Sequence, residues 1–452
     1  IFCTSALVLL LWTRASDPRW FGHLQIDPVV YQTRAVSFLE HSSWAHAGTN
    51  EYQPGALWFF VAAACGLDDP RNFDSFRRAL LVANTILLCL HILMAAAFGE
   101  KRSPWVMMIL AAASGPILFY RFELLVSFLV LSGWLFWRRG NFNTCGLLVG
   151  LAMATKIYPI LLTPLLFVDS WLAGKTRKAL SLVLATGLGV FGMAISMPVL
   201  GAKSGDLASA IQFHMNKPFG IDGSLGSLIP ILQHLLDIPL RMAPRNGIHG
   251  FDSDLGNLTT LALTWMWFPI ALAVMLLILR NQRHNLYPNA GGLFVLFGVF
   301  VGFGKLMAPQ YAWWAISLVP FITLSWMSQK QFTLMLALLV SSLLIGQIVY
   351  PLNYSEFINS FAKDPLENRL FWINAIKNLL WLGAVGIAAG NGGHHACIHH
   401  AQAAQSMHLQ LVIHYGKRII PHTAGGTGVM YRGQCIAHVL LQFRVAVDCR
   451  AR

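Results

Sequence analysis

Charged residues are scarce in this 452-residue chain, at 11% of the sequence, whereas a soluble domain carries about 25%. Hydrophobic residues make up 56% of the chain, and its mean hydropathy is +0.57. This composition excludes an ordinary soluble domain, because such a domain needs more charged residues for its surface. It predicts an integral membrane protein whose principal partner is the bilayer.

The sequence also lacks cysteines at disulfide or metal-ligand spacing, and it lacks a cluster of basic residues interleaved with aromatic ones. The seven cysteines show neither paired spacing nor the spacing of metal ligands, so we infer no disulfide framework and no zinc site. The net charge is +13, but the basic residues are dispersed in loops and are not interleaved with aromatics. We therefore predict no nucleic-acid partner, no metal and no cofactor.

Long apolar runs separated by short polar segments recur from residue 1 to about residue 389. They do not alternate as the strands of a membrane barrel would, so the predicted fold is all-α: a multi-pass helical bundle of about 11–12 spans. Because Ile1 opens inside a short apolar run, we expect the chain to begin within its first membrane helix. The predicted spans are residues 1–13, 79–99, 105–120, 123–137, 142–155, 157–172, 179–200, 257–279, 291–304, 311–327, 332–350 and 370–389.

The loops between these runs differ in charge. Alternate loops carry basic clusters, as in "EKRS", "RRGN", "KTRK", "RNQRHN" and "SQKQ", and the positive-inside rule assigns them to the cytoplasm. The other loops then face outward, among them a first loop 13–78 and a large loop 201–256. This alternation requires that the fourteen residues 54–67 form a juxtamembrane or re-entrant helix, since a full crossing would reverse the order.

Single cations stand in the short outward loops. Arg121, Lys156 and Lys305 are each flanked at once by apolar sequence, and Lys217 lies in the large outward loop. Each could be a residue that extends its charge to the interface. Together they could form a basic pocket for the phosphate of a lipid that arrives from the bilayer.

Prolines follow two of these cations closely. Pro159 comes three residues after Lys156, and Pro309 four residues after Lys305, so a helix must begin or break at each point. The outward segment "AIQFHMNKPFGIDGSLGSLIP" adds His214 and further polar residues. It could form an amphipathic helix on the membrane or a wall of a cavity.

The stretch "LQIDPVVYQTRA" contains a carboxylate in the first outward loop. Asp27, Tyr31 and Arg34 are spaced by four and three residues, so a helix that begins at Asp27 carries all three on one face. Asp27 could simply cap this helix. It could also act as a general base that takes a proton from an acceptor hydroxyl.

Several motifs together resemble glycosyltransferase family 87. They are "DPVVY", "EYQPGALWF", "RFELLVSFLVLSGWLF", "CGLLVGLAMATKIYPILLTPLLF", "FHMNKPFGIDGSLGSL" and "KLMAPQYAWWAISLVP", in the order of that family and spread over residues 1–389. The family contains polyprenol-phosphate-mannose-dependent mannosyltransferases and arabinofuranosyltransferases of the GT-C fold. The resemblance implies one GT-C-like membrane domain over residues 1–389.

The resemblance also implies roles for particular residues. Asp27 would be the catalytic base of an inverting sugar transfer, and a donor site would contain Lys305, Gln310 and Tyr311, with Lys156 near it. By the same resemblance, Lys217 would be the basic loop residue of "FHMNKPF", and we add Arg121 to the residues that would bind the donor phosphate. The residues expected to orient the substrates or contact the acceptor are Tyr31, Arg34, Tyr52, Glu123 and His214.

Two positions depart from the family pattern. An aspartate is expected where Glu123 stands, and an arginine where Lys217 stands. The sign of the charge is kept at both, but a lysine lacks the bidentate fork of an arginine. These departures concern substrate specificity more than the reaction.

The sequence therefore predicts a membrane glycosyltransferase that moves a sugar, expected to be mannose, from a polyprenyl-phosphate donor to a lipid or glycan acceptor. The expected location is a bacterial inner membrane, with the active site facing the periplasm. A multi-pass transporter, or a flippase or binding protein for polyprenyl lipids, is the alternative, with broken helices lining a path. Charges that gather on the outward face, with no clear internal repeat, favour the enzyme.

The segment 390–452 shows no membrane period and no family motif. Its "HHACIHH" could bind a transition metal adventitiously. We expect a disordered or non-native extension and assign it no function.

Overall fold

The computed structural model divides the chain into two compact units, Ile1–Ala389 and Gly390–Arg452. The predicted tail from residue 391 onward lies outside the described residues, and so do parts of the loop 201–256, so the description below concerns the first unit. The structure describes residues 2–41, 52–199, 213, 220–224, 226–237, 242–245, 248–251, 268–279, 289–304, 307–324, 326–361 and 364–390.

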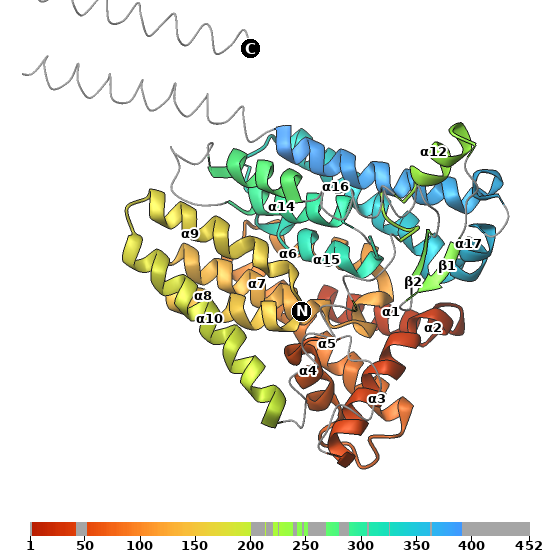
Figure 1. Cartoon of the computed structure of the whole chain (residues 1–452), viewed down its shortest axis with the longest axis horizontal. Coiled ribbons are helices and arrows are strands. Elements are labelled where there is room, and N and C mark those ends of the chain that lie inside the picture. The colour runs from red at the N-terminus through yellow and green to blue at the C-terminus, as the bar shows by residue number, and fades with distance from the viewer. Residues whose placement is uncertain are drawn as a thin grey trace, which may run out of the picture. The chain divides into compact units, whose positions relative to one another are not determined.

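The regular secondary structure in the described residues of the first half of the chain is helical (Figure 1). Its elements are α1 (Phe2–Ser16), α2 (Pro18–Leu24), α3 (Ile26–His41), α4 (Pro54–Ala64), α5 (Phe73–Phe98), α6 (Ser103–Ser114), the 3-10 helix η2 (Gly115–Tyr120), α7 (Glu123–Arg138), α8 (Phe142–Thr155), the 3-10 helix η3 (Tyr158–Leu161), α9 (Leu162–Leu172) and α10 (Thr176–Val199).

The described residues of the second half are also mainly helical, and they include an antiparallel hairpin in which Met242 pairs with Phe251. Its elements are α12 (Ile229–Leu235), β1 (Met242–Arg245), β2 (Ile248–Phe251), α14 (Ala290–Phe303), η4 (Pro309–Tyr311), α15 (Ala312–Ile316), η5 (Val319–Phe321), α16 (Gln329–Gln347), the π-helical turn η6 (Ile348–Leu352), α17 (Tyr354–Phe361) and η7 (Pro365–Glu367). Two more helices cover Phe268–Leu279 and Arg369–Gly390.

The all-α membrane architecture predicted from the sequence is confirmed. Among the described residues, five helices are long and apolar enough to cross a bilayer: Phe73–Phe98, Ser103–Tyr120, Thr176–Ser196, Gln329–Leu352 and Arg369–Gly390. Shorter apolar helices occupy six further segments. The count of 11–12 spans stays a prediction, because a helix of 10–17 residues does not by its length establish a crossing.

The predicted span over residues 311–327 is wrong as a continuous helix. The segment instead contains η4, the five-residue α15 and η5 in succession. Pro320 lacks the N–H that a longer helix needs at that position, and Pro309 begins the first turn. The side chains from Ala312 to Ile322 are buried. This segment is therefore apolar because it packs inside the bundle, and not because it faces lipid.

Local signals explain where several helices begin and end. Asn72, Asn141 and Asn289 each accept a hydrogen bond from a backbone N–H in the first turn of the helix that follows. α16 begins with a complete capping box between Ser328 and Gln331. α6 ends at Gly115, whose φ of +72° is in the left-handed region that favours glycine.

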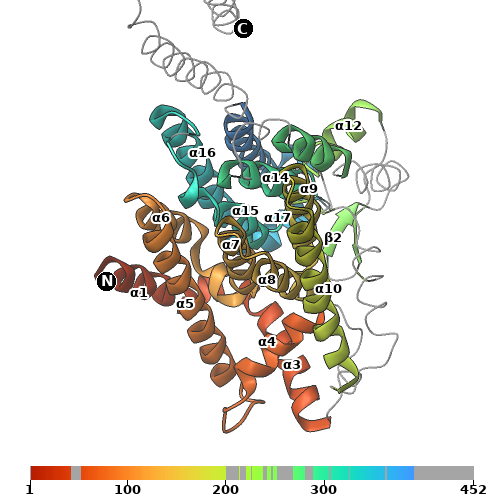
Figure 2. The same ribbon diagram turned by 90° about the vertical axis from the view of Figure 1, so that its left-hand side faces the viewer.

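Close helix packing through glycine joins α8 to α10, which lie side by side in both views (Figures 1 and 2). Gly146 and Gly150 of α8 face the backbone of α10, and a Cβ on Gly150 would overlap the Thr186 carbonyl oxygen. Small residues let helix backbones approach each other, as in other membrane bundles. This contact fixes the position of α8, whose C-terminal end leads to Lys156.

Two loops assigned to the cytoplasmic set meet in the structure. Arg102 donates hydrogen bonds to the Gln329 side chain at 3.0 Å and to the Ile322 carbonyl at 3.0 Å. Glu100 accepts a bond from the Leu324 backbone at 3.1 Å. The loops near residues 100 and 328 therefore lie at one end of the bundle, where the charge pattern predicts them to be together.

We expect Gly150→Ala to destabilise the protein by about 1–3 kcal/mol, because the added methyl group meets backbone that cannot rotate away. The matched control is Gly187→Ala in α10, where an added Cβ has no atom within 4 Å. That control should be neutral or up to about 1 kcal/mol more stable, since alanine favours helix. SDS-driven unfolding in detergent micelles measures both, and equal stability of the two variants would contradict the packing argument.

Candidate functional site

One large cavity, of about 480 Å³, gathers residues from segments that are far apart in the sequence. Its lining comes from α2, α3, the two residues before α4, the turn between η2 and α7, the break after α8, α14, η4, α15, η6 and α17, together with Asp222 of the large loop. Eight of the lining residues were predicted as site residues. The loops that contribute them are all loops that the positive-inside rule places on the outward side of the membrane. In Figure 2, α7 and α8 lie between α4 below and α14 above.

An ion pair between Asp27 and Arg121 forms one wall. Asp27 stands in the first turn of α3, and its Oδ2 lies 2.7 Å from Nη2 of Arg121. The arginine is only 5% exposed, while the carboxylate is 35% exposed and open to the cavity. Nη2 also donates to the Tyr350 hydroxyl at 2.8 Å. Burial lowers the pKa of Arg121, but Asp27, with smaller contributions from Tyr350, Tyr31 and Glu123, raises it well above the usual value.

A second ion pair, between Glu123 and Lys156, lies in the same cavity. α8 ends at Thr155, as the proline at 159 predicts, and the extended backbone of Lys156 directs its Nζ to Oε1 of Glu123 at 2.6 Å. Burial lowers the pKa of Lys156, but Glu123, together with Tyr311 and Asp27, more than offsets this, so the pKa is raised and the lysine stays cationic.

Aromatic rings surround these charges. Lys156 Nζ lies 4.4 Å from the ring centre of Tyr311 and 5.1 Å from that of Trp314, and these two rings stack at 4.4 Å. Tyr31 and Tyr52 meet edge to face at 5.4 Å on the α3 side. Such faces stabilise a cation through their quadrupole and also present flat apolar surfaces to a ligand.

Five lining residues have a buried polar atom without a hydrogen-bond partner within the described protein. The atoms are Gln53 Oε1, Arg121 Nε, Glu123 Oε2, Tyr158 Oη and Trp314 Nε1. Buried polar groups in native proteins are nearly always satisfied, so several such atoms around one space indicate partners supplied by water or by a ligand. The cavity therefore combines aromatic walls with converging polar groups, as binding sites do.

Eight predicted site residues line this cavity: Asp27, Tyr31, Tyr52, Arg121, Glu123, Lys156, Gln310 and Tyr311. Their chemical roles stay predictions. Lys217, Lys305 and His214 lie outside the described residues.

Arg34 is buried but is not among the residues that line the cavity. It shares the helix face of Asp27, yet seven residues carry it about 10 Å along the axis. Its predicted role in orienting the substrates therefore stays a prediction.

The cavity also contains residues that sequence reasoning did not select as site residues. His23, Tyr350 and Tyr354 lie beside the Asp27 wall, and Asp222 comes from the large loop. Tyr158 belongs to the "KIYP" motif, so that motif already carried a signal for it. The tyrosines of "YPLNY" carried a weaker signal, since an aromatic at the end of a span usually marks only the interface.

The charge of the described lining differs from the basic pocket predicted from the sequence. Asp27, Glu123 and Asp222 supply three carboxylates, and Arg121 and Lys156 supply two cations. Because four of these five charges form two ion pairs, Arg121 serves first to hold Asp27 in place.

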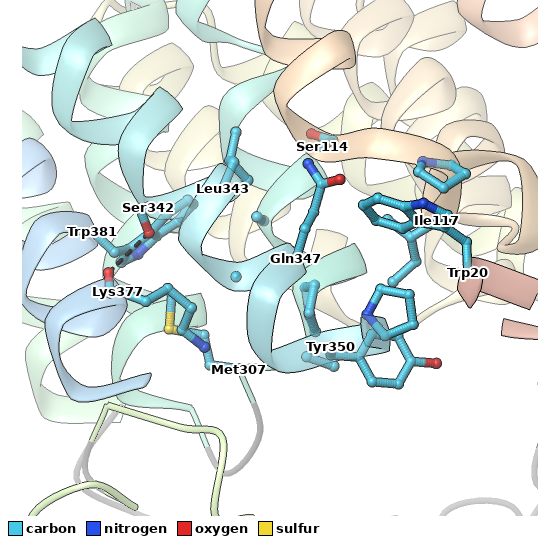
Figure 3. Close-up of a pocket in the computed structure, with 16 residues that line it drawn as sticks. Trp20, Ser114, Ile117, Met307, Ser342, Leu343, Gln347, Tyr350, Lys377 and Trp381 are labelled. Carbon is cyan, nitrogen blue, oxygen red and sulfur yellow. Dashed lines mark hydrogen bonds between the residues drawn. The ribbon is translucent and has the colours of Figure 1, made fainter. Parts of the chain in front are cut away.

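A second, very small cavity of about 30 Å³ adjoins the first and shares Ala308, Pro309 and Tyr350 with it. Figure 3 shows Lys377 and Met307 at one end and Trp20 at the other. This volume holds about one water molecule, so it is a packing defect between helices and not a site for an organic ligand.

Within the described ranges, no group of three or more His, Cys, Asp or Glu side chains could hold a metal ion. Comparisons with models of protein families, with curated proteins and with solved structures found no match to this chain. A proposal of function must therefore depend on the geometry of the cavity and on the motifs in the sequence.

We expect Glu123→Gln and Lys156→Met each to cost about 3–5 kcal/mol of stability, because each leaves a buried charge without its partner. The double variant should lose less than the sum of the two, since no unpaired charge remains. A double-mutant cycle on SDS-driven unfolding measures the coupling. Strict additivity would show that the pair does not interact energetically.

Proposed function

We propose that this membrane protein is a glycosyltransferase of the GT-C fold that takes a sugar from a polyprenyl-phosphate donor. The sugar is mannose, and the acceptor is a hydroxyl group of a lipid or glycan. The reaction takes place at the outer face of a bacterial inner membrane and inverts the anomeric carbon. The proposal agrees with the resemblance of the motifs to glycosyltransferase family 87.

The observation that carries the proposal is the convergence of the motif residues in one cavity. Asp27, Lys156 and Tyr311 come from three separate motifs, and all three line the same space of about 480 Å³. Such a volume is within the range of small-molecule sites. Aromatic faces beside unpartnered polar atoms suit a sugar, because its ring has apolar faces and its hydroxyls need hydrogen-bond partners.

The proposed reaction is a direct displacement. Asp27 takes the proton of the acceptor hydroxyl, and the oxygen bonds to the anomeric carbon while the bond from that carbon to the phosphate oxygen breaks. The electron pair leaves with the polyprenyl phosphate. Arg121 holds the carboxylate in a fixed position through the 2.7 Å ion pair, so the base is oriented before the acceptor binds.

The departing phosphate gains negative charge, and Lys156 with Gln310 and Tyr311 forms the side of the cavity that suits it. Lys156 is held between Glu123 and three aromatic rings, and it is one of the residues that line the cavity. Lys217 and Lys305 complete the proposed phosphate site. Gly304, the residue before Lys305, lines the cavity.

We expect Asp27→Asn to lower sugar transfer by about 10²–10⁴-fold, because the amide cannot accept the proton. Transfer is measured in membranes with radiolabelled polyprenyl-phosphate-mannose. The matched control is Glu40→Gln on the same helix. That carboxylate pairs with Arg71 on the surface and is not among the lining residues, so the control should transfer normally.

Two results would count against the proposal. Normal transfer by Asp27→Asn would refute the assignment of the base while leaving the reaction intact. If the parent protein transfers no sugar from any polyprenyl-phosphate donor but moves that lipid across vesicle bilayers, the protein is a flippase.

A further inference from the structure

A row of buried polar side chains on the last described helix holds the loop that carries Asp222. Asn374, Lys377 and Asn378 follow the i, i+3, i+4 spacing of one helix face, and all are at most 5% exposed. Polar residues buried in a membrane bundle are costly, so their partners indicate what they are for.

These side chains bind the backbone of the loop and not its side-chain carboxylate. Asn378 donates to the carbonyl oxygens of Asp222 at 3.4 Å and Gly223 at 3.1 Å, and Lys377 donates to the Asp222 carbonyl at 3.2 Å. Asn374 donates to the Ile221 carbonyl at 3.3 Å. Asn374 and Asn378 also share the Ser227 hydroxyl. We refer to Asn374, Lys377 and Asn378 as the polar clamp.

The polar clamp fixes Asp222 at the edge of the large cavity, where it is a lining residue. Its neighbours there form an aromatic corner: Tyr350 and Tyr354 meet edge to face at 4.9 Å, and His23 meets Tyr354 at 5.7 Å. Burial chiefly raises the pKa of the Tyr354 phenol, and the negative charge of Asp222 raises it further. Tyr354 therefore keeps its hydroxyl proton and can donate it to a ligand.

The two sides of the cavity suit different ligands. Lys156 lies on the Tyr311 side, and a phosphate belongs there. The corner of Tyr350, Tyr354 and His23 adjoins the proposed base, because Nη2 of Arg121 contacts both Asp27 and the Tyr350 hydroxyl. Asp222 adds a carboxylate to the lining, which suits a ligand rich in hydroxyl groups. A carboxylate accepts strong hydrogen bonds from hydroxyls, and the tyrosine rings offer faces for a sugar.

We propose that Asp222 binds the hydroxyl groups of an uncharged acceptor sugar in the corner formed by Tyr350, Tyr354 and His23, and that the polar clamp is the set of positioning residues for it. The inference rests on the proposed sugar transfer and adds the chemical class of the acceptor. The acceptor hydroxyl that reacts then lies toward Asp27, between this corner and the donor.

The test is steady-state transfer from polyprenyl-phosphate-mannose to octyl α-D-mannopyranoside, by the full chain in detergent. Asp222→Asn keeps the size of the side chain but loses its charge. We expect it to raise the KM for the octyl mannoside about tenfold or more, and to change the KM for the donor by less than about twofold. A raised donor KM with an unchanged acceptor KM would overturn the proposal.

A second measurement needs only the parent protein. Octyl mannosides that each lack one hydroxyl are compared as acceptors, and at least one should show the same loss as Asp222→Asn does with the full acceptor. That acceptor should lose nothing more in the variant, because the hydrogen bond is already absent. If every monodeoxy acceptor binds the parent as the full one does, the assignment of Asp222 is wrong.

The polar clamp is tested with Asn378→Ala, which should raise the acceptor KM while leaving the donor KM unchanged. The matched control is Asn84→Ala in α5, which removes an equally buried amide that donates to the Phe119 carbonyl at 2.9 Å. Asn84 does not line the cavity, so both KM values should stay unchanged in that control. An equal rise of the acceptor KM in both variants would reduce the effect to general stability and overturn the clamp.

The parent protein separates the two levels of failure. If it transfers mannose but Asp222→Asn raises the KM for the donor and leaves the KM for the acceptor unchanged, only the acceptor site is wrong. If it transfers no mannose to the octyl mannoside or to any membrane lipid, the proposed function fails and the acceptor site falls with it.

Discussion

Arg121 has its guanidinium buried among apolar helices, and the carboxylate of Asp27 lies 2.7 Å away. A charge in such surroundings costs several kcal/mol unless a counter-charge and hydrogen bonds accompany it. Two residues further, Glu123 meets the same constraint with Lys156. The short segment between η2 and α7 therefore binds α3 on one side and the end of α8 on the other. Both ion pairs join separate helices, and all four of their residues line the cavity.

The polarity of the cavity follows from this pairing. The ammonium group of Lys156 is enclosed by Phe122, Tyr311 and Trp314, where the proposed phosphate site lies. Asp222, whose backbone is held by the polar clamp, lines the same cavity and is the proposed contact of the acceptor. The proposed base, Asp27, stands in the same space.

Sequence reasoning succeeded where a local physical rule acts. Pro159 and Pro309 cannot continue a helix, and the backbone breaks near both. It failed over residues 311–327, where an apolar run was taken for one span. Hydropathy measures transfer from water, which is equally favourable into lipid and into a bundle interior, so it cannot distinguish a long lipid-facing helix from short buried turns.

The residue types, their order and the helical breaks were determined by the sequence alone, because composition, helix period and proline chemistry act between near neighbours. The tertiary structure decided which charges pair. A basic pocket was predicted from four isolated cations, yet Arg121 is committed to Asp27 and Lys156 to Glu123. Asp222 is fixed from behind by Asn374, Lys377 and Asn378, more than a hundred residues later in the chain. Such partners depend on the packing of every helix between them, and no local rule in the sequence specifies that packing.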